Sequence, residues 1–395
     1  MHFSTIDIFC HVIDNFGDAG TVYRFATELL RNMPSVRIRV FIDDLSPLMA
    51  MNPQIQPDLD HQEARDISYF DFTRLSREQC SSIAPAEILM ETYACEIPGW
   101  YLEKALFSSR LIINLESLSA EQWVEGYHLK ESLLPGGTAR KFYFMPGFTP
   151  ATGGLLFNSS IQAEKEALVN NRYAFISSLL ERTGCSVENP ASMLIGSVFT
   201  YRRSFDALLR DAATLDREVL LLCSGEKTQT SLLETLKRQE YTATGSPPML
   251  RWNNVTVVLV PFIAQSEYDR LLCCTDFNFV RGEDSWVQAI AAGKPFIWNA
   301  YIQDEQYQQV KVEAFNSFSS RFFDNNVIRR QFGTLLKTFN NVHNDASDES
   351  PDENYLFFFR NLETIEKGIS NIYFYLRQNR NLVENFLDFI LHYHG

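Results

Sequence analysis

The chain has little positive charge and no long apolar run. Its 35 Lys and Arg residues are outnumbered by 49 Asp and Glu residues, so the formal net charge is −14. A protein that binds nucleic acid or an anionic membrane over a broad area needs excess positive charge, and the sequence argues against both partners. No stretch approaches the roughly 18 apolar residues that span a bilayer, and Met1–Asp14 lacks the basic segment and cleavage site of a signal peptide.

Common metal, disulfide and nucleotide motifs are also missing. The seven cysteines are scattered and none forms a CxxC pair, so we expect neither a zinc site nor a disulfide framework. Free thiols of this kind fit a reducing cytoplasm, where we expect the protein to act. The G-x-G-x-x-G fingerprint and the P-loop lysine are absent, which makes a Rossmann oxidoreductase or an NTPase a weak interpretation. We expect no cofactor.

The chain of 395 residues is too long for one ordinary core, and its pattern predicts two α/β domains. A β-rich run at Ile6–Ile13, a turn, a helical pattern and a second strand at Val36–Ile42 form the usual opening of a doubly wound sheet. A second series begins at Met193–Phe199. We predict a first Rossmann-like domain of residues 1–178 plus 371–395, whose last helix crosses back to it. Residues 185–370 form the second, with a cleft between the two.

The remaining elements are predicted from short apolar runs and helical periodicity. Strands are expected at Ile88–Met90, Leu111–Asn114, Glu218–Cys223, Val255–Val260, Asp276–Val280 and Pro295–Trp298, and helices at Ile161–Thr183, Phe205–Leu215, Gln229–Arg238, Gln265–Cys273 and Ser285–Ala292. The acidic stretch Asn344–Asn354 is predicted to be a surface loop.

The first candidate site is the turn between the first strand and first helix, where open α/β sheets bind their ligands. Gly17 permits close backbone approach, and the carboxylates of Asp14 and Asp18 could act as general bases or hold a cationic acceptor. Both aspartates could equally be turn and N-cap residues, which are common at such junctions. His11 is predicted to lie inside the strand as a core or interface residue, and the other histidines show no ligand spacing.

The second candidate site is a strand-to-helix junction in the second domain. Arg281 offers a fork of donors to a diphosphate, and the first amides of the following helix point the same way. Glu283 could accept from a ribose or sugar hydroxyl. The alternative is an N-cap, with Asp284 or Ser285 capping the helix and Arg281 forming a surface ion pair.

Aromatic and amide residues recur at the other strand ends of the second domain. A flat ring that stacks and an amide that reads polar edges suit a pyrimidine base, although each residue alone is more often part of a core. The set comprises Phe199, Tyr201, Phe262, Gln265, Tyr301 and Gln303.

Taken together, five motifs resemble the bacterial protein-arginine rhamnosyltransferases that modify translation elongation factor P. They are Asp14-Asn15-Phe16-Gly17-Asp18-Ala19-Gly20, Ile113-Asn114-Leu115-Glu116, Pro146-Gly147-Phe148, Thr152-Gly153-Gly154-Leu155 and Arg281-Gly282-Glu283-Asp284-Ser285. They occur in order over most of the chain. The resemblance implies a GT-B fold, dTDP-β-L-rhamnose as donor, an arginine of elongation factor P as acceptor, and inversion at the anomeric carbon without a metal. No DxD-type metal motif sits in a suitable loop, which agrees with that last expectation.

The resemblance also assigns roles. It implies that Asp18 is the base with Asp14 beside it, and that Glu283 belongs to the catalytic set. Gly17 is expected near the donor. Thymidine contacts are implied for Phe199, Tyr201, Phe262 and Gln265, and phosphate and sugar contacts for Arg281, Glu283, Asp284 and Ser285. The sequence departs from the family pattern at Asn299 and Ile302, where a histidine and a proline are expected.

Arginine is a demanding acceptor. Its guanidinium has a pKa of about 13.8, and an ordinary aspartate lies roughly ten units lower, so simple deprotonation before attack is excluded. We therefore expect the carboxylates to orient the guanidinium and to accept its proton late, as the C–N bond forms. Two other readings stay open: a GT-B transferase with another donor or acceptor, and a nucleotide-sugar-binding regulator without turnover.

Overall fold

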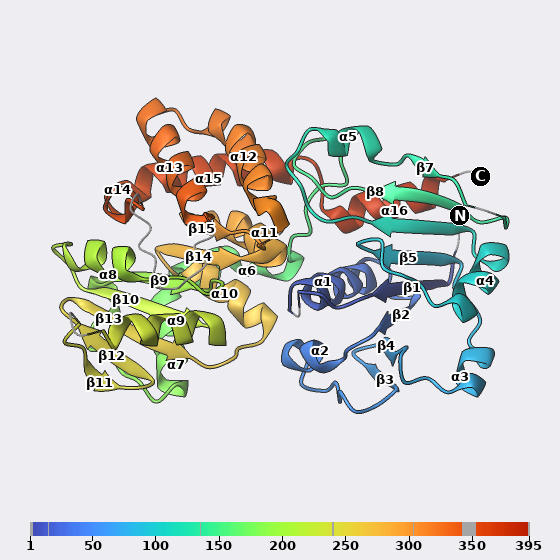
Figure 1. Ribbon diagram of the computed structural model, residues 1–395, viewed down its shortest axis with the longest axis horizontal. Helices are drawn as coiled ribbons and strands as arrows, with labels where there is room; N and C mark the ends of the chain where they lie inside the picture. Colours follow the sequence, from blue (N-terminus) through green and yellow to red (C-terminus); the bar gives the residue numbers. More distant parts are fainter. Residues whose placement is uncertain are drawn as a thin grey trace. The chain divides into compact units, whose positions relative to one another are not determined.

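The protein is described by a computed structural model at residues 3–14, 16–134, 136–238, 241–302, 304–341 and 353–393. The chain divides into two compact units, Met1–Ser159 with Leu376–Gly395, and Ser160–Tyr375 (Figure 1). Of the acidic stretch predicted to be a surface loop, residues 344–352 lie outside the described residues.

The first unit is built on an eight-stranded sheet in the order β3-β4-β2-β1-β5-β6-β8-β7. Its six central strands are parallel: β1 (Thr5–Cys10), β2 (Arg37–Ile42), β4 (Ile67–Asp71), β5 (Ile88–Thr92), β6 (Leu111–Leu115) and β8 (Arg140–Phe144). The edge strands β3 (His61–Ala64) and β7 (Glu131–Ser132) are antiparallel to their neighbours. Its helices are α1 (Phe16–Asn32), α2 (Ser46–Met51), α3 (Arg77–Ser82), α4 (Gly99–Ser108), α5 (Trp123–Tyr127) and α16 (Leu382–His392).

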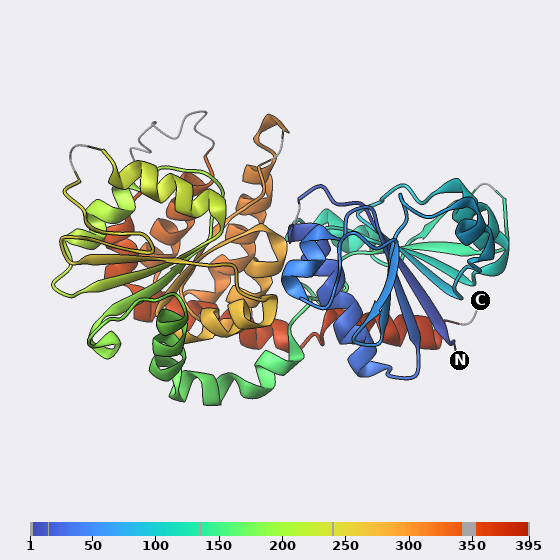
Figure 2. The ribbon, with the colours of Figure 1, turned by 90° about the horizontal axis from the view of Figure 1, so that it is seen from below.

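Both faces of this sheet are buried. Because side chains alternate along a strand, Ile6 and Ile8 point to one face and Phe9 to the other. On the first face they pack with α1 and with α16, which lies alongside α1 (Figure 2). On the second face Phe9 stacks on Phe41 at 4.6 Å between ring centroids and meets Tyr101 of α4. This double burial explains the nearly continuous apolar strands.

The second unit has a seven-stranded sheet in the order β11-β12-β13-β10-β9-β14-β15. Five strands are parallel: β9 (Leu194–Val198), β10 (Val219–Ser224), β13 (Val255–Val260), β14 (Phe277–Arg281) and β15 (Phe296–Asn299). The edge strand β11 (Thr244–Ser246) and its neighbour β12 (Met249–Trp252) form an antiparallel hairpin, and β12 is also antiparallel to β13. Its helices are α6 (Ser159–Asn170), α7 (Arg172–Arg182), α8 (Asp206–Ala213), α9 (Glu226–Leu236), α10 (Gln265–Cys274), α11 (Gly282–Ala292), α12 (Gln308–Ser319), α13 (Asn326–Phe339), α14 (Tyr355–Arg360) and α15 (Leu362–Arg377).

The boundary between the units lies earlier than the predicted residue 178. Helices α6 and α7 belong to the second unit, because Ile176, Leu179 and Leu180 pack in its core. Lys165 of α6 also donates to the carbonyl of Ala291 at 2.8 Å. The chain returns to the first unit at Leu376 rather than at residue 371, since most of α15 packs in the second unit.

The parallel parts of the two sheets share one arrangement. In each, the strand order reverses beside the first strand, between β1 and β5 in the first unit and between β9 and β14 in the second. At such a reversal the connections leave toward opposite faces, which opens a crevice at the carboxyl ends of the strands. Asp14, Gly17 and Asp18 follow β1, Phe199 and Tyr201 follow β9, and Arg281 ends β14. Other predicted site residues of the second unit follow β13 and β15, at the same edge of that sheet.

Candidate functional site

In the first unit, the turn after β1 is organised by the carboxylate of Asp18. Its Oδ2 accepts hydrogen bonds from the backbone amides of Ile13 and Asp14, both at 2.8 Å. Asp18 is the third residue of α1, where a carboxylate is favoured by the helix dipole. A Cβ at Gly17 would lie 2.7 Å from Asp14 Oδ2, so a larger residue here would displace the Asp14 carboxylate. The structure thus brings Asp14, Gly17 and Asp18 together, and Asp18 holds the turn before α1 without being its N-cap, because the amides that it accepts precede the helix. Asn15 lies outside the described residues.

His11 is not a core residue, which corrects the prediction. Strand β1 ends at Cys10, and the His11 side chain is 58% exposed. Its Nδ1 forms an ion pair with Asp43, whose other oxygen accepts the Val12 amide at 2.8 Å. Asp43 follows β2 directly, and parallel neighbours end at the same sheet edge, which is why the two residues meet.

This edge also has a strained backbone segment that the sequence does not predict. Tyr93 and Ala94, directly after β5, have φ angles of +57° and +51°, a region that non-glycine residues rarely adopt. The Ala94 amide donates to Asn114 Oδ1 at 3.1 Å, and Asn114 Nδ2 donates to Glu116 at 2.7 Å. The Asn114–Glu116 motif was the only sequence signal here. The strained pair lies beside β1, at the switch point of the sheet.

In the second unit, Arg281 lies against two aromatic rings. Its guanidinium carbon is 4.2 Å from the ring centroid of Phe199 and 5.0 Å from that of Tyr201, and its Nη1 donates to the carbonyl of Thr200 at 3.1 Å. These residues follow β9, the neighbour of β14. The Arg281 guanidinium is therefore in a cation–π arrangement with both rings.

The first turn of α11 is fixed by Ser285. The Arg281 amide donates to Ser285 Oγ at 3.1 Å, and the Ser285 hydroxyl donates back to the Arg281 carbonyl. Gly282 has a φ of +67° and begins the helix. Ser285 is buried, so its observed role is to hold the turn from which the helix amides emerge.

Two predicted donor-site residues form a direct pair. Gln265 Nε2, at the start of α10, donates to Asp284 Oδ2 at 2.9 Å. Glu283 instead forms an ion pair with Lys311 of α12 at 3.1 Å. Phe262 is 58% exposed on the loop after β13. Tyr301 lies with its ring centroid 5.8 Å from that of Tyr201, whereas Gln303 lies outside the described residues.

The carboxyl edge of the second sheet also carries unsatisfied polar groups. The hydroxyls of Thr200 and Ser224 are buried and, within the described part of the chain, have no hydrogen-bond partner. Such groups are rare in native proteins unless a ligand or water satisfies them. Beside them, Gly225 allows Phe199 to approach, since a Cβ there would lie 2.6 Å from the ring. This edge can therefore receive a polar ligand with a flat group.

Among the described residues, no three or more His, Cys, Asp and Glu side chains are grouped so that they could hold a metal ion. Among the same residues, no helix combines the length and apolar composition that crossing a membrane requires.

Comparison with known proteins identifies the family. Residues 6–391 match the EarP family model, described as elongation-factor P (EF-P) rhamnosyltransferase. The protein-arginine rhamnosyltransferase of Pseudomonas putida is 35% identical over 325 residues, which cover 79% of this chain and 80% of that protein. The enzyme of the same name from Shewanella oneidensis is 34% identical over 320 residues, covering 78% and 79%.

A solved structure supports the fold. It concerns EarP-mediated arginine glycosylation of translation elongation factor EF-P, and it matches 99% of this chain and 100% of its own with a TM-score of 0.65 at 21% identity. The fold is thus of the GT-B type, as the sequence predicted. Since the family model spans nearly the whole chain and the relatives exceed 30% identity, the chain belongs to the EarP family and is a protein-arginine rhamnosyltransferase.

Proposed function

We propose that this enzyme transfers rhamnose from dTDP-β-L-rhamnose to an arginine of elongation factor P in the cytoplasm, with inversion and without a metal. The proposed donor site rests on one observation: the Arg281 guanidinium lies against two aromatic rings, beside the first turn of α11. A guanidinium and helix-terminal amides together suit a diphosphate. The unsatisfied Thr200 and Ser224 hydroxyls add polar groups for the nucleotide or sugar.

The acceptor half rests on the turn after β1. Asp14 and Asp18 place two carboxylates within one short turn, where they can bind a cationic guanidinium and hold its positive charge on the nitrogens that do not react. The lone pair of the remaining nitrogen attacks the anomeric carbon as the bond to the diphosphate oxygen breaks. The diphosphate leaves with the bonding electron pair, and a carboxylate of the turn takes the proton released from the new C–N linkage. Arg281 stabilises the departing charge.

Mass spectrometry of the acceptor tests this proposal. Purified elongation factor P is incubated with the enzyme and dTDP-β-L-rhamnose in the presence of EDTA, and we expect a gain of one rhamnosyl group on arginine. A factor whose acceptor arginine is replaced by lysine is the matched control and should stay unmodified. Product formation only with another nucleotide sugar would contradict the donor assignment. A dependence on Mg²⁺ would contradict the metal-free mechanism.

A regulator without turnover gives a different result. It would bind dTDP-rhamnose in calorimetry yet leave every acceptor unmodified. Single-turnover conditions, with enzyme in excess over donor, separate a slow enzyme from such a regulator.

A further inference from the structure

The loop Thr200–Phe205, which carries Tyr201, is held on one side by a row of buried hydroxyls. Thr228, Ser231 and Thr235 lie on one face of α9 and are at most 2% exposed. Their hydroxyls accept the amides of Thr200 at 2.8 Å, Arg203 at 3.3 Å and Phe205 at 3.4 Å. Their spacing of three and four residues matches the repeat of a helix, so one helix meets successive amides of the loop.

Thr228 has a second contact that links it to Arg281. Its hydroxyl donates to the carbonyl of Thr200 at 3.1 Å, and the same carbonyl accepts Nη1 of Arg281 at 3.1 Å. Thr228 therefore fixes the peptide to which the guanidinium is tied.

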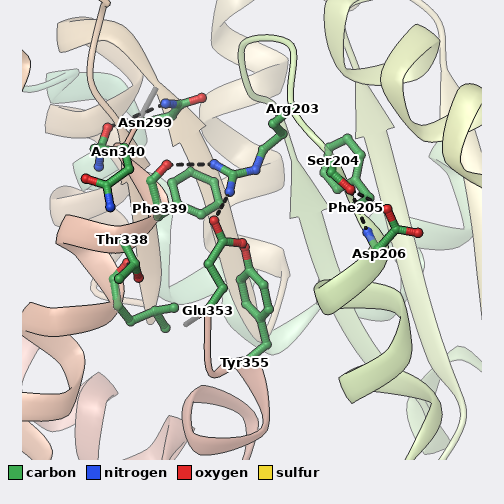
Figure 3. Close-up of polar contacts among 12 residues, drawn as sticks. Arg203, Ser204, Phe205, Asp206, Asn299, Thr338, Phe339, Asn340, Glu353 and Tyr355 are labelled. Carbon is green, nitrogen blue, oxygen red and sulfur yellow. Dashed lines mark hydrogen bonds and ion pairs between the residues drawn. The ribbon is translucent and has the colours of Figure 1, made fainter. Parts of the chain in front are cut away.

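On the other side the loop is held by two buried asparagines (Figure 3). Asn299 Oδ1, at the end of β15, accepts the Tyr201 amide at 3.0 Å. Asn340, which ends α13, accepts the Ala300 amide at 2.8 Å and lies 3.5 Å from Asn299 Nδ2. Its own Nδ2 donates to the carbonyls of Trp298 and Leu336, both at 2.8 Å. Asn340 thus holds the end of β15 in the position from which Asn299 reaches Tyr201.

The loop is tied down again just beyond Tyr201. Arg203 donates to the carbonyl of Phe339 at 2.8 Å and forms a buried ion pair with Glu353, which also accepts the hydroxyl of Tyr355 (Figure 3). The Arg203 guanidinium carbon lies 3.4 Å from the ring centroid of Phe339. An unpaired charge here would be costly, so this contact is a firm anchor.

We propose that Thr228 and Asn340 are positioning residues of the donor site, which hold Tyr201 and Arg281 in the geometry that binds the nucleotide diphosphate. This inference rests on the donor site proposed above. Both residues are buried, at 0% and 3% exposed, and act through the loop backbone and Asn299. The Thr228 hydroxyl and the Asn340 amide each use both donor and acceptor, and buried polar side chains paired in this way specify one arrangement of the chain around them.

The test compares dTDP affinity with thermal stability in matched variants. Thr228→Val keeps the shape of the side chain but removes the hydroxyl, whereas Thr228→Ser retains it. Asn340→Ala removes the link to the end of β15. The control is Asn254→Ala. Asn254 Nδ2 donates to the carbonyls of Ala212, Leu215 and Arg217 at 2.8–3.2 Å. Because Asn254 directly precedes β13, it lies at the amino ends of the parallel strands, whereas the proposed donor site lies at their carboxyl ends.

We expect Thr228→Val and Asn340→Ala to weaken dTDP binding, measured by calorimetry, about tenfold, which corresponds to about 1.4 kcal/mol. The KM for the donor should rise similarly, with kcat at saturating donor within about twofold of wild type. Thr228→Ser should restore binding, and Asn254→Ala should lower the melting temperature without changing dTDP affinity.

Two outcomes overturn the proposal, and they are distinguishable from each other. If the folded Thr228→Val or Asn340→Ala protein binds dTDP within about twofold of wild type, the network is merely structural and the proposed donor site stands. If the wild-type enzyme itself fails to bind dTDP, the donor assignment fails and this inference falls with it. Should Thr228→Val not fold, Asn340→Ala decides the question.

Discussion

Replacing Asp18 by asparagine separates the two roles that the structure leaves to this side chain. Both backbone amides of the turn, those of Ile13 and Asp14, bond to the same oxygen, Oδ2. The amide oxygen of an asparagine can therefore take over both hydrogen bonds. The variant loses only the negative charge at the N-terminus of α1, which is worth about 0.3–1 kcal/mol to stability. The turn should stay in place while the proposed general base is lost.

We therefore expect Asp18→Asn to lower turnover by about 10² or more, with dTDP affinity close to normal. Asp18→Ala, which loses both hydrogen bonds, should also lower the melting temperature clearly. Asp43→Asn is the matched control, because Asp43 likewise holds a loop amide at this edge, that of Val12, and should leave turnover near wild type. Turnover, calorimetry and thermal unfolding are measured on all three proteins. Near-normal turnover of Asp18→Asn would remove Asp18 from the proton transfer.

Three further predictions concern the donor, the pH dependence and the C-terminal helix. In Arg281→Lys, the ammonium group cannot both donate to Thr200 and make the contact that the guanidinium makes with the two rings. In calorimetry with EDTA present, dTDP should therefore bind about tenfold more weakly. Unchanged affinity would refute the role of the ring contact. Burial lowers the pKa of His128 from 6.5 to about 4, and its Nδ1 accepts the Met145 amide. As the pH is lowered, the unfolded chain therefore protonates His128 before the folded protein does. The free energy of unfolding should fall by at most about 3 kcal/mol between about pH 6.5 and pH 4. Urea unfolding of His128→Asn should not show this part of the pH dependence. Phe386→Ala should cost about 3–5 kcal/mol because the ring is fully buried against Phe25 and Phe144, whereas Phe374→Ala, 60% exposed, should be nearly neutral.

The buried strands were predictable because parallel strands covered on both faces read as continuous apolar runs. Val255–Val260 is the clearest case, predicted and observed with the same bounds. The edge hairpin β3–β4 was missed, since its outer strand, His61–Ala64, is short and polar and resembles a loop. The end of β1 was placed three residues late, because Val12 and Ile13 are β-branched although their chain has already left the sheet.

The sites were only partly predictable from sequence. Arg281 and Asp18 could be found because each stands at a strand-to-helix junction, which is a local signal. The rings beneath Arg281 come from a strand far earlier in the chain. Asn340, which lies 41 residues from Asn299, reads as an ordinary helix end. Contacts of this kind are set by tertiary packing, and no local pattern encodes them.

The charge of each site agrees with the charge of the substrate proposed for it. Each site stands at the switch point of its sheet, where the strand order reverses, so topology alone cannot assign the two substrates. The turn after β1 carries Asp14 and Asp18, and a pair of carboxylates in one turn attracts a cation such as arginine. The edge beside β14 carries Arg281 against two rings, which suits an anion attached to a flat base. Exchanging the two substrates would place a diphosphate against carboxylates and a guanidinium against Arg281, and each like-charge contact is unfavourable. The residues that differ between the two crevices therefore favour the proposed placement of the donor in the second unit and of the acceptor in the first.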